Sequence, residues 1–353
     1  MTAPHDLTGL IDVPRLARYL AERLPGADAP LTVEKHQAGF SNETFYVTRG
    51  EQRWVLRRPP RGVFLPTAHD VLREYRVLSG LQGTGVRVPR VVLACEDPDV
   101  IGAPFYLMER VEGVVIREEM PPALDTPAER RRISEELIDA LAELHAVDYR
   151  ACGLEGLGRP QGYLERQLRR WQGQLDLTLQ RTRPLPGIAE VGDWLRAHLP
   201  ESGPPTIVHG DYKLDNVMFA AQAPARLVAI FDWEMATLGD PLADLGWLLS
   251  YWGETGLPVE QMTPGSNLLT ATLPGFLTRE EMIARYEART GRSMRHISFY
   301  LCLAVWKLAI ILEGLYAHYL EGTASNPRAA EFEWRVPQQI ERMHRIIAGA
   351  SGA

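Results

Sequence analysis

Short runs of alternating hydrophobic and polar residues fill most of the first third of the chain and predict strands. Two stretches in this region instead repeat their apolar residues at helical spacing. The predicted elements are, in order, a helix at 11–24, strands at 32–37, 44–48 and 53–58, a helix at 69–81, and strands at 91–95 and 104–110. After its opening helix, this region is therefore predicted to form three strands, one helix and two further strands.

From about residue 112 the pattern changes to helical periodicity. The first helix of this part begins at Thr126-Pro-Ala-Glu129, which has the residues of a capping box and a proline at the first helical position. Helices are predicted at 126–145, 163–181, 190–198, 242–252, 279–290, 293–319 and 326–347, and a surface loop at 257–274. These patterns predict an α+β fold of two lobes, a small antiparallel β-rich lobe over residues 1–111 and a larger, mainly helical lobe over residues 112–353.

Two polar motifs interrupt the hydrophobic runs of the second lobe, His209-Gly-Asp-Tyr-Lys-Leu-Asp-Asn216 and Ile230-Phe-Asp-Trp-Glu234. Phosphoryl transfer needs a carboxylate to orient and deprotonate the acceptor hydroxyl, plus an amide and a second carboxylate to hold Mg²⁺ on the phosphates. Asp211, Asn216 and Asp232 supply these three groups. Because Gly and Asp are also common in ordinary turns, only the joint pattern of strands and loops carries the prediction. It indicates a kinase-like catalytic core that uses ATP and Mg²⁺.

The β-rich lobe contains residues that such a core would use to bind the nucleotide. Gly39 and Asn42 lie in the first turn, where backbone N–H groups are expected to cover the ATP phosphates, although an ordinary hairpin is the alternative. Arg57 of the third strand is expected to clamp the phosphates and to pair with Glu74, which is otherwise a surface residue. Arg58 is expected to face solvent, because strand neighbours point to opposite faces.

Further residues are assigned to the site or kept out of it. Glu109 comes just before a predicted hinge at 111–113, whose backbone is expected to meet adenine, and we assign it to nucleotide binding. Lys213 is expected to reach the γ-phosphate, with a solvated lysine as the alternative. His145 is expected to be a hydrogen-bonding residue at a helix end rather than a catalyst.

Two aspartates that follow the second motif are expected to have structural roles. Asp240 is expected to cap a helix that has Pro241 at its start, and Asp244 to hold the catalytic loop by hydrogen bonds.

Composition narrows the class of protein. A length of 353 residues favours two lobes, and a net charge of −7 argues against a nucleic-acid binder. Three separated cysteines indicate neither a disulfide framework nor a zinc site, and the N-terminus lacks the features of a secretory signal. The apolar stretch 297–312 contains Lys307 and is expected to be a buried helix rather than a membrane span. A cytoplasmic protein is expected, and its oligomeric state is not predicted.

The chain resembles the aminoglycoside phosphotransferase family of small-molecule kinases, which has a protein-kinase-like fold, and within it a subgroup found alone in bacteria or fused to acyl-CoA dehydrogenases. The resemblance covers nearly the whole chain and rests on residues 54–60, 69–75, 105–109, 209–216, 231–234, 239–241 and 244. It implies Asp211 as catalytic base, Asn216 and Asp232 as Mg²⁺ ligands, and a phosphate clamp at the third strand. Arg57 stands where the wider family has Lys, although the subgroup commonly has Arg.

The acceptor is expected to be a small molecule with a hydroxyl group. Asp232 is followed almost directly by the next helix, which leaves no room for the platform on which protein kinases hold a peptide. Aromatic residues in the helices that follow favour a partly apolar acceptor such as a hydroxy acid or its acyl thioester. The alternatives are an amino-sugar or choline-type kinase, a catalytically silent nucleotide-binding module, and a metal-dependent hydrolase that uses His209, Asp211 and Asp232.

Overall fold

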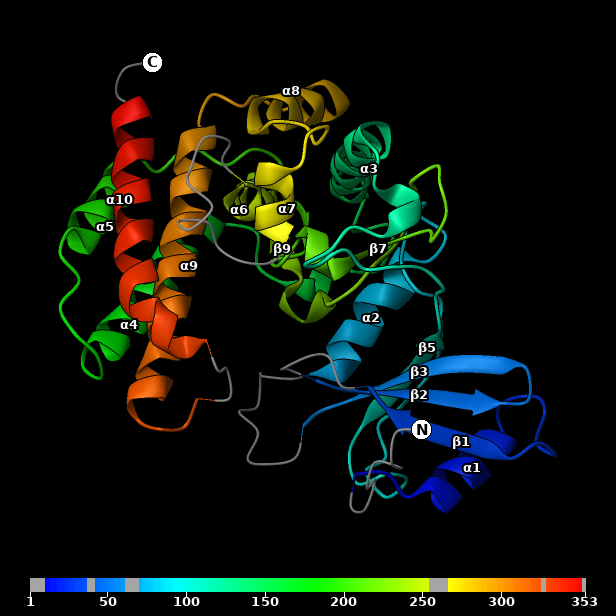
Figure 1. Cartoon of the computed structure of the whole chain (residues 1–353). Coiled ribbons are helices and arrows are strands. Elements are labelled where there is room, and N and C mark those ends of the chain that lie inside the picture. The colour runs from blue at the N-terminus through cyan, green and yellow to red at the C-terminus, as the bar shows by residue number, and fades with distance from the viewer. Residues whose placement is uncertain (1–9, 37–41, 61–69, 254–265, 325–327, 351–353) are drawn as a thin grey trace.

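A five-stranded antiparallel sheet forms the small lobe of the computed structural model, which describes residues 10–36, 42–60, 70–253, 266–324 and 328–350 (Figure 1). The sheet has the order β1-β2-β3-β5-β4. Its elements are α1 Val13–Ala21, β1 Leu31–Lys35, β2 Glu43–Arg49, β3 Gln52–Arg58, α2 Val71–Leu81, β4 Val91–Cys95 and β5 Phe105–Glu109. The predicted succession of three strands, a helix and two strands is confirmed.

The two faces of this sheet are buried against different helices. Leu56 and Leu107, which pair across β3 and β5, pack with α1, whereas Val55 and Met108 pack with α2 and the core of the large lobe. This alternation follows from the period of two along a strand. Arg57 therefore lies on the face toward α2 and the other lobe.

The expectation that Arg58 faces solvent is wrong. Only 3% of its surface is exposed, and its guanidinium donates to the carbonyls of Pro59 and Leu10. Arg58 does point to the face opposite Arg57, but α1 and the segment before it cover that face. Alternation along the strand predicts the direction of a side chain and not what lies there.

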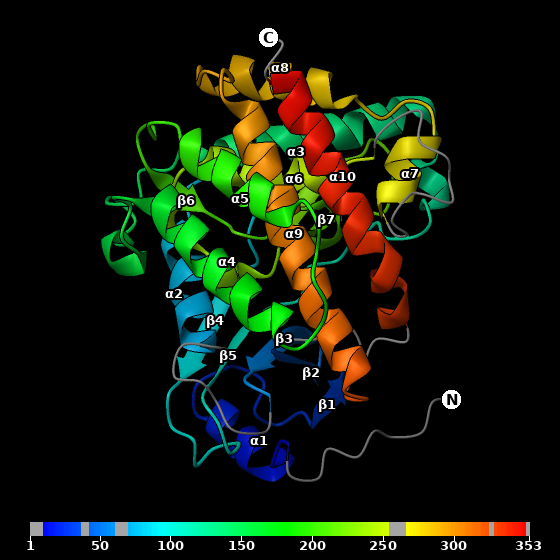
Figure 2. The same cartoon turned by 90° about the vertical axis from the view of Figure 1, so that its left-hand side faces the viewer.

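The large lobe is built around one long helix, α9 (Figure 2). The helices of this lobe are α3 Pro127–His145, α4 Tyr163–Leu179, α5 Ile188–Ala197, α6 Leu242–Tyr251, α7 Ser266–Thr272, α8 Arg279–Thr290, α9 Ile297–Leu320 and α10 Phe332–Ala350. Four helices, α4, α5, α6 and α10, pack against α9. Of all the helices given above for this lobe, the sequence predicts each one except α7. α9 is long and apolar enough to be a candidate membrane span, yet 61% of its most apolar window is buried inside the protein. It is the core helix of this lobe.

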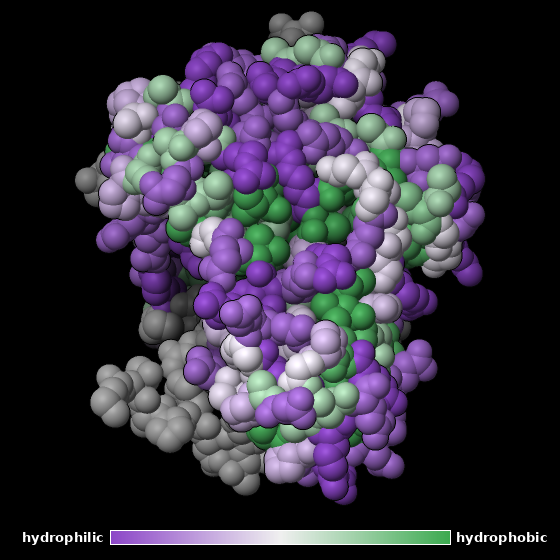
Figure 3. Space-filling view, turned by 90° about the vertical axis from the view of Figure 1, so that its right-hand side faces the viewer, coloured by the Kyte–Doolittle hydropathy of each residue, from purple (hydrophilic) through white to green (hydrophobic). Residues whose placement is uncertain are grey.

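Two short strand pairs lie between the helices and hold the polar motifs. β6 Thr206–Val208 pairs with β9 Thr237–Gly239, and β7 Val217–Phe219 pairs with β8 Leu227–Ile230. The loop with the first motif joins β6 to β7, and the second motif follows β8. On the face in Figure 3, hydrophilic residues cover most of the surface and hydrophobic ones gather mainly in its hollows.

The start of α3 differs in one detail from the expected capping box. The Thr126 hydroxyl accepts from the Glu129 N–H at 3.2 Å, as expected. The Glu129 carboxylate, however, accepts from the backbone N–H of Ala225 at 2.6 Å and so ties α3 to the turn between β7 and β8. A tertiary contact thus replaces half of the local motif.

Candidate active site

Asp244 of α6 holds the loop that follows β6. Its carboxylate accepts from the backbone N–H of His209 at 2.6 Å and of Gly210 at 2.8 Å. Gly210 has φ +86°, and a Cβ there would lie 2.8 Å from the carbonyl oxygen of Met235, so only glycine fits. The expected anchoring role of Asp244 is confirmed by these contacts.

A buried histidine completes this anchor. His145, at the end of α3, contacts Asp244 at 3.2 Å through Nε2 and the hydroxyl of Tyr286 at 2.6 Å through Nδ1. Burial lowers the pKa of His145. Burial acts to raise the pKa of Asp244, but the hydrogen bonds from His145 and Gly210 hold it below its ordinary value. His145 is thus a hydrogen-bonding residue at a helix end, as expected.

Asp240 precedes Pro241, which is the N-cap residue of α6, so it lies one residue before the expected capping position, although its side chain still binds the start of the helix. Its Oδ1 accepts from the N–H of Leu242 at 3.0 Å, and its Oδ2 accepts from the Tyr300 hydroxyl at 2.7 Å. Both aspartates therefore serve to fix the backbone around the motif.

Asp211 is surrounded by hydrogen-bond donors from three directions. Lys213 Nζ lies 2.9 and 3.1 Å from its two oxygens, and the Asn216 amide donates to Oδ2 at 2.7 Å. The third donor is the indole N–H of Trp247 in α6, 2.7 Å from Oδ1. Sequence reasoning did not assign this contact to Trp247, because the residue lies in an apolar helix that reads as core.

Asp232 follows two residues after the last residue of β8 and has φ +66°, a conformation that non-glycine residues rarely adopt. Two hydrogen bonds hold the preceding residue, since Phe231 N–H donates to Asn216 O at 2.9 Å and the Phe231 carbonyl contacts His209 Nε2 at 2.8 Å. Asp232 Oδ1 is buried without a hydrogen-bond partner. A cation would satisfy this oxygen.

The residues around Asp232 suit Mg²⁺ bound together with phosphates. Among the described residues, no three His, Cys, Asp or Glu side chains converge into a metal site of their own. Asn216 and Asp232 line one cleft, and each has a side-chain oxygen that can serve as a ligand. Mg²⁺ is commonly held by one or two protein oxygens plus substrate phosphates, so this small donor set fits that ion.

Arg57 and Glu74 form a two-pronged ion pair beside Asp232. Arg57 Nε and Nη2 donate to the Glu74 carboxylate at 3.2 and 3.3 Å, and Nη1 donates to the Thr44 hydroxyl at 3.1 Å. Nη2 also lies 3.9 Å from Asp232 Oδ1. Burial acts to lower the pKa of Arg57, but Glu74, Tyr106 and Asp232 raise it above its ordinary value. Arg57 is thus a fixed positive charge beside Asp232.

The other residues predicted to bind the nucleotide, Gly39, Asn42 and Glu109, differ in how the structure bears on them. Gly39 lies outside the described residues. Asn42 is buried, and its amide donates to Glu234 Oε2 at 3.4 Å, which links the first turn of the small lobe to the segment after Asp232. Glu109 lines the cleft, but its carboxylate pairs with Arg90. The cleft between the lobes has a volume of about 300 Å³ and includes the hinge residues 111–113.

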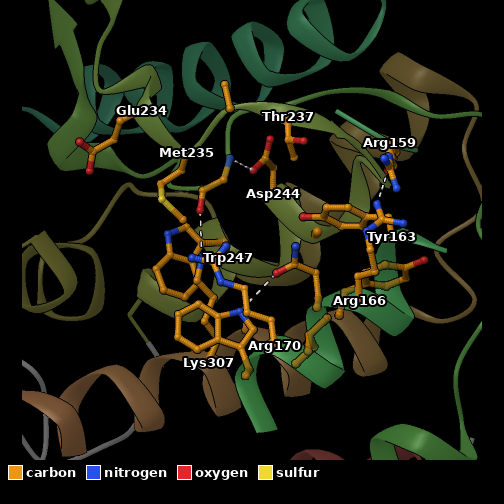
Figure 4. Close-up of a pocket in the computed structure, with 18 of the residues that line it drawn as sticks. Arg159, Tyr163, Arg166, Arg170, Glu234, Met235, Thr237, Asp244, Trp247 and Lys307 are labelled. Carbon is orange, nitrogen blue, oxygen red and sulfur yellow. Dashed lines mark hydrogen bonds between the residues drawn. The ribbon is translucent and has the colours of Figure 1, made fainter. Parts of the chain in front are cut away.

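A second and larger cavity, of about 720 Å³, lies beside the loop that follows β6 (Figure 4). It reaches this loop at Gly210 and is also lined by Trp247 of α6 and by Lys307 of α9, whose Nζ donates to the Gly210 carbonyl at 3.0 Å. Lys307 also lies over the Trp247 ring, 3.8 Å from its centroid. No pattern in the sequence predicts this contact, because the apolar residues of α9 indicate a core helix.

Comparison with known proteins yields one family and a consistent set of relatives. Residues 32–272 match the profile of the phosphotransferase enzyme family. Acyl-CoA dehydrogenase family member 11 from Gallus gallus is 38% identical over 93% of this chain, and the human protein of that name is 36% identical over 89%. The chain spans only about two fifths of the length of these relatives, 42% and 40% respectively.

Solved structures agree with the fold. A crystal structure from Ralstonia eutropha JMP134, provisionally described as an aminoglycoside phosphotransferase, is 34% identical and has a TM-score of 0.82, with 97% of this chain and 99% of that chain covered. Choline kinase from Cryptosporidium parvum is 12% identical with a TM-score of 0.64, covering 96% of each chain, and supports the fold alone. The expected kinase-like α+β fold of two lobes is confirmed.

Proposed function

This chain belongs to the phosphotransferase enzyme family, and we propose that it is an ATP-dependent kinase that transfers the γ-phosphate to a hydroxyl group of a small, hydroxyacyl acceptor. One observation carries the proposal. Asp211, Asn216, Asp232 and Arg57 come from three separate segments and meet around the loop between the two cavities, in the arrangement that phosphoryl transfer requires.

Each residue has a role in this proposal. Asn216 and Asp232 would hold Mg²⁺, and Arg57, fixed by Glu74, would hold the phosphates of ATP in the cleft of about 300 Å³. When bound, Mg²⁺ supplies charge neutralisation on the phosphates. Asp211 orients the acceptor hydroxyl and takes its proton, while Lys213 offers positive charge beside it. Positioning and charge, rather than covalent chemistry, account for most of the expected rate.

The short segment after Asp232 and the apolar lining of the second cavity support a small, partly apolar acceptor. Only residues 233–241 separate Asp232 from α6, and this segment forms a short helix, the strand β9 and the turn into α6. The cavity also has apolar walls from Trp171, Trp247 and Leu303. A hydroxyacyl compound has both a hydroxyl group and an apolar chain. The names of the acyl-CoA dehydrogenase relatives favour the same class of acceptor.

A kinase of amino sugars or of choline-type alcohols is the second candidate, and it is favoured by the choline kinase among the similar folds. Mg²⁺-dependent ADP production with separate pools of hydroxy acids, their CoA esters, amino sugars and amino alcohols distinguishes the two. Only the hydroxyacyl pools should raise turnover, and Asp211→Ala should abolish this while ATP still binds. Asp232→Ala should instead weaken binding of Mg²⁺-ATP itself. Faster turnover with the amino sugars would contradict the proposed acceptor.

A further inference from the structure

We propose that the large cavity beside the catalytic loop contains a binding subsite for an anionic group, a carboxylate or a phosphate, on the acceptor. The inference rests on the proposed kinase function and specifies which acceptors that site selects. It starts from the charges that line the cavity.

Positive side chains outnumber negative ones around the cavity. Its lining includes the cations Arg73, Arg159, Arg166, Arg170 and Lys307, against Asp70, Glu234 and Asp244. Arg159, Arg166, Arg170 and Lys307 make no ion pair with a carboxylate among the residues that the structure describes. Unpaired cations in a concave surface attract and retain anions.

The acidic residues of the lining are already bound elsewhere. Asp244 accepts hydrogen bonds from His209 and Gly210 and contacts His145. Asp70 caps α2 by accepting from the N–H of Arg73 at 2.9 Å. Glu234 accepts from Asn42 and lies at the opposite side of the cavity from Arg159 and Arg166 (Figure 4). None of these carboxylates neutralises the side of the cavity that holds Arg159 and Arg166.

The cations differ in how much of their charge is available to a ligand. Arg73 donates to the carbonyls of Leu157 and Ala236 at 2.7 and 2.6 Å, and Arg166 donates to the carbonyls of Gln161 and Arg159, so these two brace the wall. Arg159 and Arg170 are exposed at the mouth of the cavity.

Lys307 lies inside the cavity. Its ammonium contacts the Gly210 carbonyl and the ring of Trp247. Lys307 and Arg170 therefore form the inner and outer parts of one positive surface.

The position of the hydroxyl relative to this surface follows from the loop. Gly210 and Trp247 line the cavity and directly contact or adjoin Asp211, whereas Asn216, Asp232 and Arg57 line the other cleft. An acceptor with its hydroxyl at Asp211 would extend along Trp247 toward Arg170. A cationic amino sugar would be repelled there, and a compound with an anionic group away from the hydroxyl would be attracted.

Charge reversal at Arg170 tests this subsite without relying on turnover. Binding to the Mg²⁺-ADP-saturated protein would be followed by the fluorescence of the cavity tryptophans, using 3-hydroxybutyrate, its uncharged methyl ester and its CoA thioester. Arg170→Glu should weaken binding of the anionic ligands about tenfold and leave the methyl ester unchanged. Arg169→Glu is the matched control, since Arg169 is exposed on the same helix and does not line the cavity. It should have little effect.

The pattern across ligands identifies the bound group. Weakening of the acid indicates a carboxylate subsite, and weakening of the thioester alone indicates a subsite for the CoA phosphates. Equal binding of all three ligands, or anion binding that Arg170→Glu does not change, overturns the inference. Charge-dependent binding without turnover of any acceptor would contradict the kinase proposal and leave the subsite intact. Turnover of an acceptor without charge-dependent binding would support the kinase proposal and overturn the subsite.

Discussion

The indole N–H of Trp247 donates a 2.7 Å hydrogen bond to Oδ1 of Asp211, the proposed catalytic base. The bond joins α6 to the loop after β6, and Asp244, one turn earlier on the same helix, holds the backbone of that loop. α6 therefore fixes both the main chain and the carboxylate of the loop. The same indole ring carries the ammonium of Lys307 on its face.

Trp247→Phe should lower kcat about tenfold with little change in KM for ATP. The substitution keeps an aromatic ring but removes the hydrogen bond that orients Asp211, and a hydrogen bond to a charged group contributes about 1.5 kcal/mol. Steady-state kinetics measures this. Trp252→Phe is the control, because Trp252 lies at the end of α6 and donates to the Leu277 carbonyl, away from Asp211. An unchanged kcat in Trp247→Phe would show that the bond does not position the base.

Glu74→Ala should destabilise the protein by about 3 kcal/mol, because it leaves the guanidinium of Arg57 buried without its carboxylate partner. The side chain of Glu74 is 3% exposed and that of Arg57 15%. Urea unfolding gives the change in the free energy of unfolding. Glu321→Ala removes an Arg181–Glu321 pair whose side chains are about 40% exposed, and it should change stability little. Similar small effects in both variants would contradict a structural role for the buried pair.

Asp244→Asn should both destabilise the protein, by about 2 kcal/mol, and reduce kcat. The amide has a single acceptor oxygen, so it cannot accept from the N–H groups of His209 and Gly210 through separate oxygens as the carboxylate does. Denaturant unfolding and steady-state kinetics measure the two effects. Loss of stability with full kcat would mean that the loop keeps its geometry without this anchor.

Lys307 should make unfolding stability depend on pH between about 8 and 10.5. Burial lowers the pKa of Lys307 from 10.5 to about 8. The negative charges of Asp211 and Asp244 act to raise this pKa, and repulsion by Arg170 and Lys213 acts to lower it further. Between these two values the unfolded chain binds more protons than the folded chain, so stability rises with pH. The extra stability that comes from keeping the buried lysine neutral is fully present above pH 10.5. It is lost as the pH falls through the folded-state pKa of about 8.

The free energy of unfolding of the wild type minus that of Lys307→Met isolates this group from other titrations. The difference should increase from pH 8 to pH 10.5. A flat difference would show that Lys307 keeps its ordinary pKa in the folded protein.

Local patterns in the sequence were sufficient for much of the site. The apolar runs before Asp211 and Asp232 become β6 and β8, and Arg57 meets Glu74 because strand alternation and helix position both direct them to the same face. The roles assigned to these residues, and the lobe boundary after residue 111, remain predictions.

Contacts that depend on the packing of distant elements could not be predicted in this way. Trp247 and Lys307 lie in helices whose apolar sequences indicate only burial, and the packing of α6 against α9 brings both side chains to the loop. Arg58 was assigned to solvent because the sequence does not show that α1 covers its face of the sheet. Glu129 similarly leaves its local capping position for Ala225, a residue 96 positions away.

The central claim is that Asp211 directs phosphoryl transfer from ATP to an acceptor hydroxyl. ³¹P NMR of a reaction with Mg²⁺-ATP and a hydroxyacyl-CoA acceptor, wild type beside Asp211→Ala, tests it most directly. The account predicts a new phosphomonoester resonance on the acceptor in step with ADP, present for the wild type and absent for Asp211→Ala. Release of inorganic phosphate alone, or an equal phosphomonoester signal from both proteins, would contradict it.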